Sequence, residues 1–363
     1  MLLRGCFRIL LFYDVAEAID LGNLRGILGD RASPVQRAFP RRTPEYVRFE
    51  HVPIVEAGEP LELSSGERLA CSIKYYSYAV AEAQLEAPFE GDWETIRSQS
   101  SHWMNTVEIE PQVRERVRSH LQRVAPAITR LSDEWLLEEY LVIDLHEARQ
   151  ASGHPATAAD LLGAEGTHIV QLIRGETAPL APRSVEEALQ ASLSYYSSDL
   201  VVVGSAAALV YDRPEDAAAT IQTLEYAKSQ LLEFRYYDEL MTRVLSGVYA
   251  ALDRKRNILF SRRSFTRDAN RLNTIRLDVM ELTERIDNTI KFLSDIFYAR
   301  VYRLAAGRMG VPDYRALVEQ KLRTAGELYE VMVGQFNEAR TFVLELAITL
   351  LCLLDVLLLL RGK

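Results

Sequence analysis

The chain has 363 residues, of which 48% are hydrophobic and 26% charged, and its formal net charge is −9. This composition is that of a folded protein, not a disordered one, and the length predicts two or three domains. The acidic balance argues against broad nucleic-acid binding, because neutralising phosphates requires a basic face. Cys6, Cys71 and Cys352 are far apart in sequence, which excludes a disulfide framework and the usual zinc-binding spacings.

Residues 1–212 predict an α+β body with a largely antiparallel sheet. Arg4 and Arg8 interrupt the first apolar run and Asp14 ends it, so we expect a strand there and not a signal peptide. Predicted strands cover Phe7–Tyr13, Tyr46–Glu56, Ala70–Leu85, Tyr140–Leu145 and Leu200–Tyr211. Helical periodicity covers Leu21–Leu28, Trp93–Val124, Ala158–Leu162 and Val185–Leu193.

Residues 213–341 predict a helical, coiled-coil-like stalk. Pro214 opens a helix whose apolar residues from Leu224 to Leu252 recur at steps of three and four, with Asp238 as the polar member of the seam. A second helix is predicted from Phe265 to Ala306. A third begins at Pro312 and runs without another proline into the final apolar segment.

Residues 342–360 predict a transmembrane helix. These 19 residues span roughly 28 Å as a helix, close to the roughly 30 Å of a hydrocarbon core. Two acids interrupt the segment, and they lie on one helical stripe with three other polar residues: Glu338, Glu345, Thr349, Cys352 and Asp355. We interpret the stripe as a polar seam between identical helices. The alternatives are that each acid lies near a membrane boundary, or that the stripe lines a pore.

A search for chemistry yields no catalytic, cofactor-binding or metal-binding motif. The six histidines are scattered, and neither a phosphate-binding glycine loop nor a nucleophile elbow occurs. Glu233, Asp238, Glu284 and Asp287 have the residue types of a metal site between bundle helices. Ion pairs at helical spacing, such as Glu281 with Arg285, explain most of that pattern. We therefore predict no catalytic residue, no cofactor and no metal.

Three segments of the C-terminal half resemble the RMND1/Rmd1 family, its bacterial members in particular. They are LEYAKSQLLEFRYYDELM (224–241), ELTERIDNTIKFLSDIFYARVYRLAA (281–306) and the closing ARTFVLELAITLLCLLDVLLLL. The resemblance implies an α+β domain, a helical region and one C-terminal transmembrane helix entered through an Arg…Leu-Glu sequence, which Arg340 and Leu344-Glu345 match. The strand IKYYSYAV (73–80) resembles a family strand that leads to a glycine-containing turn, and Ala79 occupies the position where we expect glycine.

Eukaryotic members of that family are mitochondrial inner-membrane proteins associated with translation by the organelle ribosome. No Arg/Ser-rich transit segment precedes the first strand here. The resemblance therefore implies a single-pass C-terminal anchor in a bacterial inner (cytoplasmic) membrane, with the body in the cytoplasm. It implies no catalytic residue.

From these patterns we predict a membrane-tethered, self-associating scaffold or adaptor without catalytic activity. Its expected partners are the lipid bilayer, further copies of the chain and another protein at the membrane, and not nucleic acid. Two alternatives stay open. One is an enzyme at the membrane surface with its site in the α+β body, and the other is a CorA-like channel or transport component.

Overall fold

The computed structural model describes residues 1–34, 53–253, 274–284 and 296–361. The chain divides into two compact units, Met1–Tyr236 with Arg285–Tyr314, and Tyr237–Glu284 with Arg315–Lys363. The predicted domains 1–212, 213–341 and 342–360 stay a prediction.

The first unit contains a mixed α+β fold built on one large sheet. Its described strands lie in the order β10-β11-β12-β9-β1-β7-β6-β4-β3, and β5 pairs with β6. All pairs are antiparallel except β12 with β9. A separate pair is formed by β2 and β8. The strands are β1 (Leu2–Asp14), β2 (Ala18–Ile19), β3 (Ala32–Pro34), β4 (Ile54–Ala57), β5 (Leu61–Glu62), β6 (Arg68–Tyr75), β7 (Val80–Gly91), β8 (Ile128–Thr129), β9 (Leu137–Arg149), β10 (Ser192–Leu193), β11 (Leu200–Val203) and β12 (Ala207–Tyr211).

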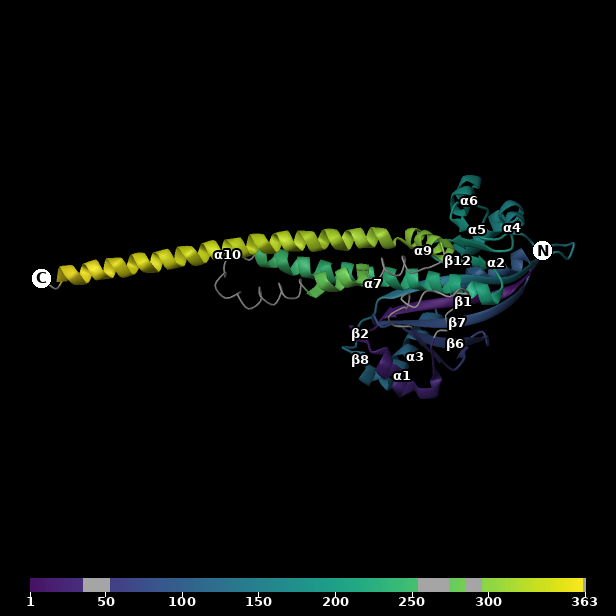
Figure 1. Cartoon of the computed structure of the whole chain (residues 1–363), viewed down its shortest axis with the longest axis horizontal. Coiled ribbons are helices and arrows are strands. Elements are labelled where there is room, and N and C mark those ends of the chain that lie inside the picture. Colours follow the sequence, from purple (N-terminus) through teal and green to yellow (C-terminus); the bar gives the residue numbers. More distant parts are fainter. Residues whose placement is uncertain (35–52, 254–273, 285–295, 362–363) are drawn as a thin grey trace. The chain divides into compact units, whose positions relative to one another are not determined.

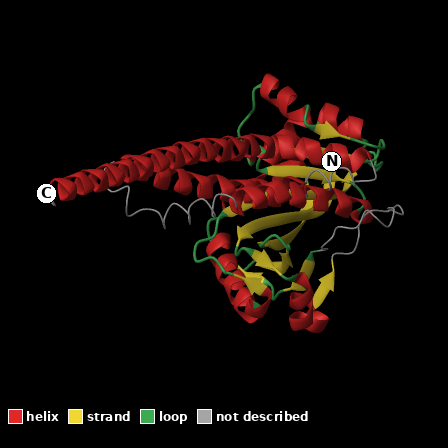
Figure 2. Ribbon diagram, turned by 60° about the vertical axis from the view of Figure 1, so that its left-hand side comes forward, coloured by secondary structure: helices red, strands yellow, loops and turns green. Residues whose placement is uncertain are grey.

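Helices lie on both faces of this sheet (Figures 1 and 2). The described helices of the whole chain are α1 (Leu21–Leu28), α2 (Trp93–Asn105), α3 (Ile109–Arg123), α4 (Ala158–Ala164), α5 (Gly166–Arg174), α6 (Pro182–Leu189), α7 (Pro214–Asp253), α9 (Ile296–Met309) and α10 (Val311–Arg361). Of these, α7 from Tyr237 and α10 from Arg315 belong to the second unit. The apolar core lies on one face, where Phe7, Ile9 and Leu11 of β1 pack with buried residues of α1 to α5. Because side chains alternate along a strand, Arg8, Leu10 and Phe12 point to the other face.

Two predicted strands prove to be hairpins. The run Ala70–Leu85 divides into β6 and β7, and Leu200–Tyr211 divides into β11 and β12. The first turn contains Ala79, whose φ of 68° is in the left-handed region that favours glycine. The glycine expected at this position therefore corresponds to a real requirement of the backbone, which alanine meets here at a conformational cost.

The predicted transmembrane helix is wrong. None of the helices in the described part of the chain combines the length and the apolarity needed to cross a membrane. In α10 the side chains beyond 330 are described only at 341, 345 and 347–353. The continuous stretch 347–353 covers only about 10 Å of helix, against the roughly 30 Å of a hydrocarbon core. The structure therefore does not support a fold that ends in a transmembrane helix. It also does not support a single-pass anchor in an inner membrane.

A β-bulge between β1 and β9 brings two backbones unusually close. The pairing register shifts between Arg4 and Gly5, which leaves His146 as the extra residue between Leu145 and Glu147. A Cβ atom at Gly5 would lie 2.1 Å from the carbonyl oxygen of Asp144. Only glycine fits this approach without movement of the strands.

We expect Gly5→Ala to destabilise the protein by about 3 kcal/mol, because the added methyl group meets backbone atoms that cannot rotate away. The measurement is urea unfolding of the full chain. Gly26→Ala in α1 is the matched control, since no atom lies within 4 Å of its Cβ position, and it should raise stability by about 0.5–1 kcal/mol. Equal stability of Gly5→Ala and wild type would contradict the close approach.

Candidate functional site

The second face of the sheet carries a line of charged side chains, which we call the charged row. It consists of Lys74, Glu82, Phe12 and Glu138 on the neighbouring strands β6, β7, β1 and β9. Residues paired across antiparallel strands point to the same face. Three of the four side chains are ionisable, and their residues are at most 8% exposed. Buried charges of this kind require partners.

Helix α7 supplies these partners. Glu225 accepts a hydrogen bond from Lys74 Nζ, and Lys228 and Arg235 both form ion pairs with Glu138. All residues of α7 from 217 to 234 except Ala218, Gln222 and Tyr226 are buried, so most of the helix surface is covered. Its other side contacts α9, where the Tyr302 hydroxyl donates a hydrogen bond to Gln230 Oε1.

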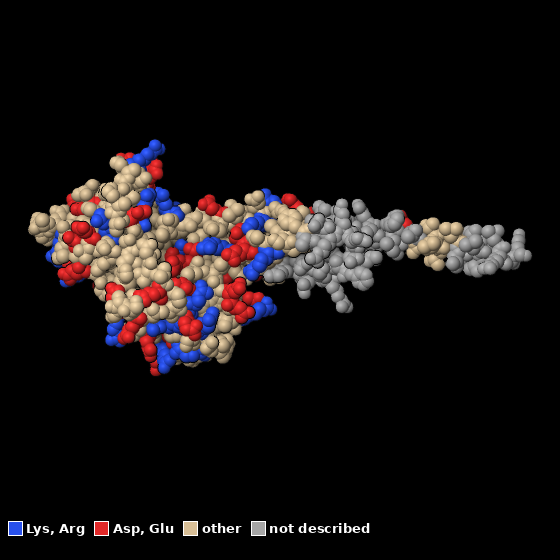
Figure 3. All heavy atoms as spheres, turned by 180° about the vertical axis from the view of Figure 1, so that it is seen from behind, with Lys and Arg blue, Asp and Glu red and all other residues tan. Residues whose placement is uncertain are grey.

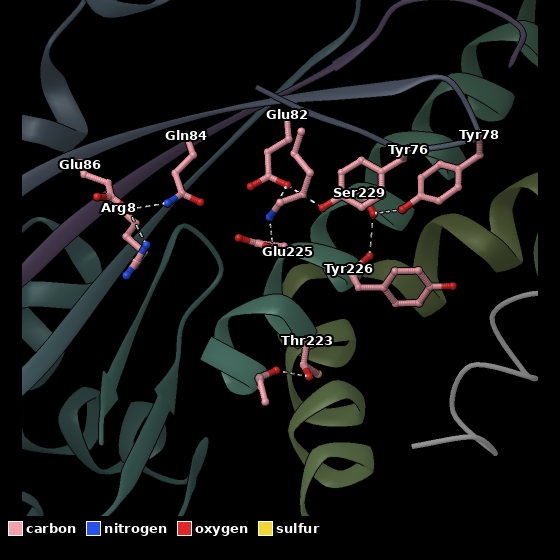
Figure 4. Close-up of polar contacts among 12 residues, drawn as sticks. Arg8, Tyr76, Tyr78, Glu82, Gln84, Glu86, Thr223, Glu225, Tyr226 and Ser229 are labelled. Atoms are coloured by element: carbon pink, nitrogen blue, oxygen red, sulfur yellow. Dashed lines mark hydrogen bonds and ion pairs between the residues drawn. The ribbon is translucent and has the colours of Figure 1, made fainter. Parts of the chain in front are cut away.

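Tyrosines complete the arrangement at the Lys74 end of the row (Figure 4). The Tyr76 hydroxyl donates to Glu82 Oε2 at 2.6 Å. Ser229 donates to the Tyr226 carbonyl oxygen at 2.9 Å and lies 2.8 Å from the Tyr78 hydroxyl, which therefore donates to Ser229. The bond between Tyr78 and Ser229 connects the β6–β7 turn to α7.

The environment shifts several pKa values along the row. Burial and the nearby Glu225 carboxylate raise the pKa of Glu82 to about 8. Burial alone lowers the pKa of Lys74, but the charges of Glu225 and Glu82 outweigh it and the net shift is upward. At the other end, burial lowers the pKa of Lys228 to about 8, opposed by the charge of Glu139.

A second polar cluster lies toward the bulge. Arg8 donates to Asp144 at 2.9 Å and to Glu86 at 2.6 Å, and Gln84 donates to the same Glu86 oxygen at 2.8 Å. His146 Nε2 lies 3.2 Å from Asp144 Oδ2. The guanidinium of Arg8 therefore pairs with two carboxylates, of which Asp144 is buried.

A third cluster fixes α3 to strand β4 on the core face. Glu56 accepts hydrogen bonds from Tyr75 at 3.1 Å and Arg123 at 2.7 Å, and His120 Nδ1 lies 2.9 Å from it. Burial alone raises the pKa of Glu56, but the hydrogen bonds and charges of His120 and Arg123 outweigh it and lower the pKa. All of these donors converge on one buried carboxylate.

The sequence-predicted stripe on α10 is described only in part. Glu345, Thr349 and Cys352 are exposed, and the Thr349 hydroxyl donates to the Glu345 carbonyl oxygen at 2.7 Å. The side chains of Glu338 and Asp355 lie outside the described residues. The stripe as an oligomer seam stays a prediction. Within the described parts of the chain no three His, Cys, Asp or Glu side chains gather as metal ligands.

Sequence reasoning missed the charged row and the Glu56–His120 pair. Lys74 and Glu225 are 151 residues apart, and Glu56 and His120 are 64 apart. No spacing rule connects residues at such separations. The one usable signal is the alternation of Glu82, Gln84 and Glu86 along a β-rich run, which indicates a polar sheet face but not what covers it.

Acidic and basic side chains intermingle on the face of the molecule seen in Figure 3. On that face the described residues form no extended area of one charge. This face therefore offers no single-charge surface as a candidate site, and the buried clusters are the candidate instead.

The chain belongs to the family described as "Uncharacterized protein MJ0711, N-terminal domain", whose sequence model matches residues 4–217. A curated relative, Uncharacterized protein MJ0711 of Methanocaldococcus jannaschii, is 21% identical over 190 residues, which are 52% of this chain and 58% of that protein. The chain thus spans little more than half of that relative's length. No solved structure matches the chain significantly. The matched region includes Lys74, Glu82 and Glu138, and ends before Glu225.

We expect Lys74→Met to lower the free energy of unfolding by about 3–5 kcal/mol, because it leaves the Glu225 carboxylate buried without its cation. Adding Glu225→Leu should restore most of the loss, since an apolar pair of similar volume replaces an ion pair at little cost. Urea unfolding of the two single variants and the double variant measures the coupling. Arg4→Met, which breaks an exposed pair with Glu90, should cost about 0.5 kcal/mol or less. Strictly additive effects of the two buried changes would contradict the pairing.

A pH dependence follows from Glu56. Its pKa is lowered on folding, so its contribution is present above the unfolded-state pKa of about 4.3 and is lost as the pH falls through the folded-state pKa. We expect Glu56→Gln to be less stable than wild type by about 2–3 kcal/mol at neutral pH, with the difference shrinking in acid. Chemical unfolding as a function of pH measures this. Glu62→Gln, in an exposed pair with Arg68, is the control, and a gap that stays constant in acid argues against the assignment.

Proposed function

We propose that this member of the MJ0711 N-terminal domain family is a non-enzymatic scaffold that self-associates through α10. The observation that carries the proposal is a run of exposed apolar side chains on that helix. Ile348, Leu350, Leu351 and Leu353 are 54–65% exposed. Contiguous apolar surface of this kind marks an interaction site in folded proteins.

A second copy of the chain is the occupant that the surface favours. Glu345, Thr349 and Cys352 lie among the apolar residues, and polar residues within an apolar seam fix the register of identical helices at some cost in stability. In a parallel pair of α10 helices each residue near the seam lies close to its own counterpart. The resemblance of the C-terminal half to the RMND1/Rmd1 family also supports assembly, and belonging to that family is part of this proposal.

The body supports a scaffold more than an enzyme. The Glu56–His120 pair lies within a cluster that also takes hydrogen bonds from Tyr75 and Arg123. A carboxylate that accepts several structural hydrogen bonds is held in place and is a weak base. Glu82, Glu225 and Glu138 are engaged in the packing of α7. We infer that these groups give the body rigidity, which a scaffold needs.

Sedimentation velocity of the full chain over a concentration series tests self-association. We expect dimers or larger species for wild type, and at least tenfold weaker association for Leu351→Asp, because a charge would be buried at the seam. Leu317→Asp is the matched control, since Leu317 is also an exposed leucine of α10, 44% exposed and 34 positions earlier in the helix. It should associate like wild type.

Oxidative crosslinking gives the geometry of the pair. Cys6 and Cys71 are buried and Cys352 is exposed, so a disulfide-linked dimer should form through Cys352 and be absent in Cys352→Ser. A chain that stays monomeric at every concentration rules the proposal out. Association without the crosslink would rule out the parallel register.

A further inference from the structure

One end of the charged row holds more negative than positive charge. The side chains of Lys74, Glu82 and Glu225 are 10%, 0% and 4% exposed. Lys74 Nζ contacts Glu225 directly and lies 3.5 Å from Glu82 Oε2. Two carboxylates therefore share one ammonium in a region that excludes water. If both were ionised, the cluster would bury a net charge of about −1, which is strongly unfavourable.

The groups that face Glu82 offer no second cation. Strand β6 supplies Lys74, the β6–β7 turn supplies the Tyr76 hydroxyl, α7 supplies the Glu225 carboxylate, and β1 supplies the apolar ring of Phe12. Glu82 Oε1 is buried and has no hydrogen-bond partner among the residues that the structure describes.

The cations that α7 brings to the row are already engaged. Lys228 and Arg235 both pair with Glu138, on the far side of the β1 strand. Glu138 is two strands from Glu82, roughly 10 Å away at ordinary strand spacing. At that distance the partly screened charges of Lys228 and Arg235 stabilise an ionised Glu82 much less than a cation in contact with it would.

We propose that Glu82 and Glu225 together hold one proton, and that this proton is the condition for docking of the first half of α7 on the sheet. With the proton bound, Lys74 and the remaining carboxylate form a neutral pair and the helix packs. Without it, a net negative charge is buried and α7 loosens from β6 and β7. The docking of α7 on the sheet thus depends on one bound proton, and we call this arrangement the latch. It is independent of whether α10 self-associates.

The direction of the pH response follows from linkage. The docked state holds one proton more than the loosened state, in which the carboxylates are solvated, so the docking constant falls as the pH rises. The raised pKa of Glu82, about 8, sets the highest pH at which the docking constant still changes with pH. Between about pH 6 and that value, docking should weaken about tenfold per pH unit, and it should level off above.

Hydrogen–deuterium exchange of the full chain, corrected for the intrinsic rate at each pH, tests the latch. In wild type the protection of amides in residues 222–232 should fall about tenfold per unit between pH 6 and 8. Glu82→Gln keeps the side-chain shape without the titration, and its protection should change less than about twofold. Glu90→Gln is the matched control on the same strand, because its side chain is 51% exposed, and it should respond like wild type.

Two further variants keep the outcome decisive. If Glu82→Gln does not fold, Glu225→Gln should remove the pH response in the same way, because it leaves a single carboxylate for Lys74. Lys228→Met should retain the response. A flat profile in wild type, a pH response that persists in both glutamine variants, or its loss only in Lys228→Met would each overturn the proposal.

Discussion

The fold of the first unit depends on matching charges across the interface between α7 and the sheet. The sheet contributes Lys74, Glu82 and Glu138, and the helix contributes Glu225, Lys228 and Arg235. Each ion removed from water carries a penalty of several kcal/mol that only a well-placed partner offsets. The interface therefore tolerates few alternative positions of the helix, because a shift along its axis would separate the partners.

The two faces of the sheet make different contributions. The core face packs apolar side chains such as Ile9 and Leu11 against helices, and this burial supplies most of the stability because it scales with apolar area. The opposite face adds little net stability from its ion pairs, since desolvation cancels much of the Coulomb attraction. Those ion pairs contribute selectivity, because apolar contact is non-directional, whereas a buried ammonium must meet a carboxylate within a few ångströms.

Local patterns in the sequence predicted the parts of the fold that depend on local physics. Helix α1 has the predicted bounds Leu21–Leu28, because Asp20 accepts hydrogen bonds from its first amides and Gly29 ends it with a positive φ. The run Ala70–Leu85 was predicted as one strand because its turn contains neither glycine nor proline, and Ala79 adopts the left-handed conformation instead. The contacts that join α7 to the sheet and α3 to β4 were not predictable, since Lys74 and Glu225 are 151 positions apart and Glu56 and His120 are 64 apart.

Helix α7 shows why its apolar repeat is interpreted as a coiled-coil-like seam with Asp238 as the polar member. Periodicity records which residues recur on one side of a helix but not whether water or protein lies there. In the first unit the polar residues of α7 meet the charged row, and Arg235 is the last of them. In the second unit Asp238 of the same helix pairs with Lys321 of α10 at 2.6 Å. Each unit thus holds its own part of α7 by ion pairs, so the apolar repeat alone could not distinguish a coiled-coil seam from a helix buried within a body.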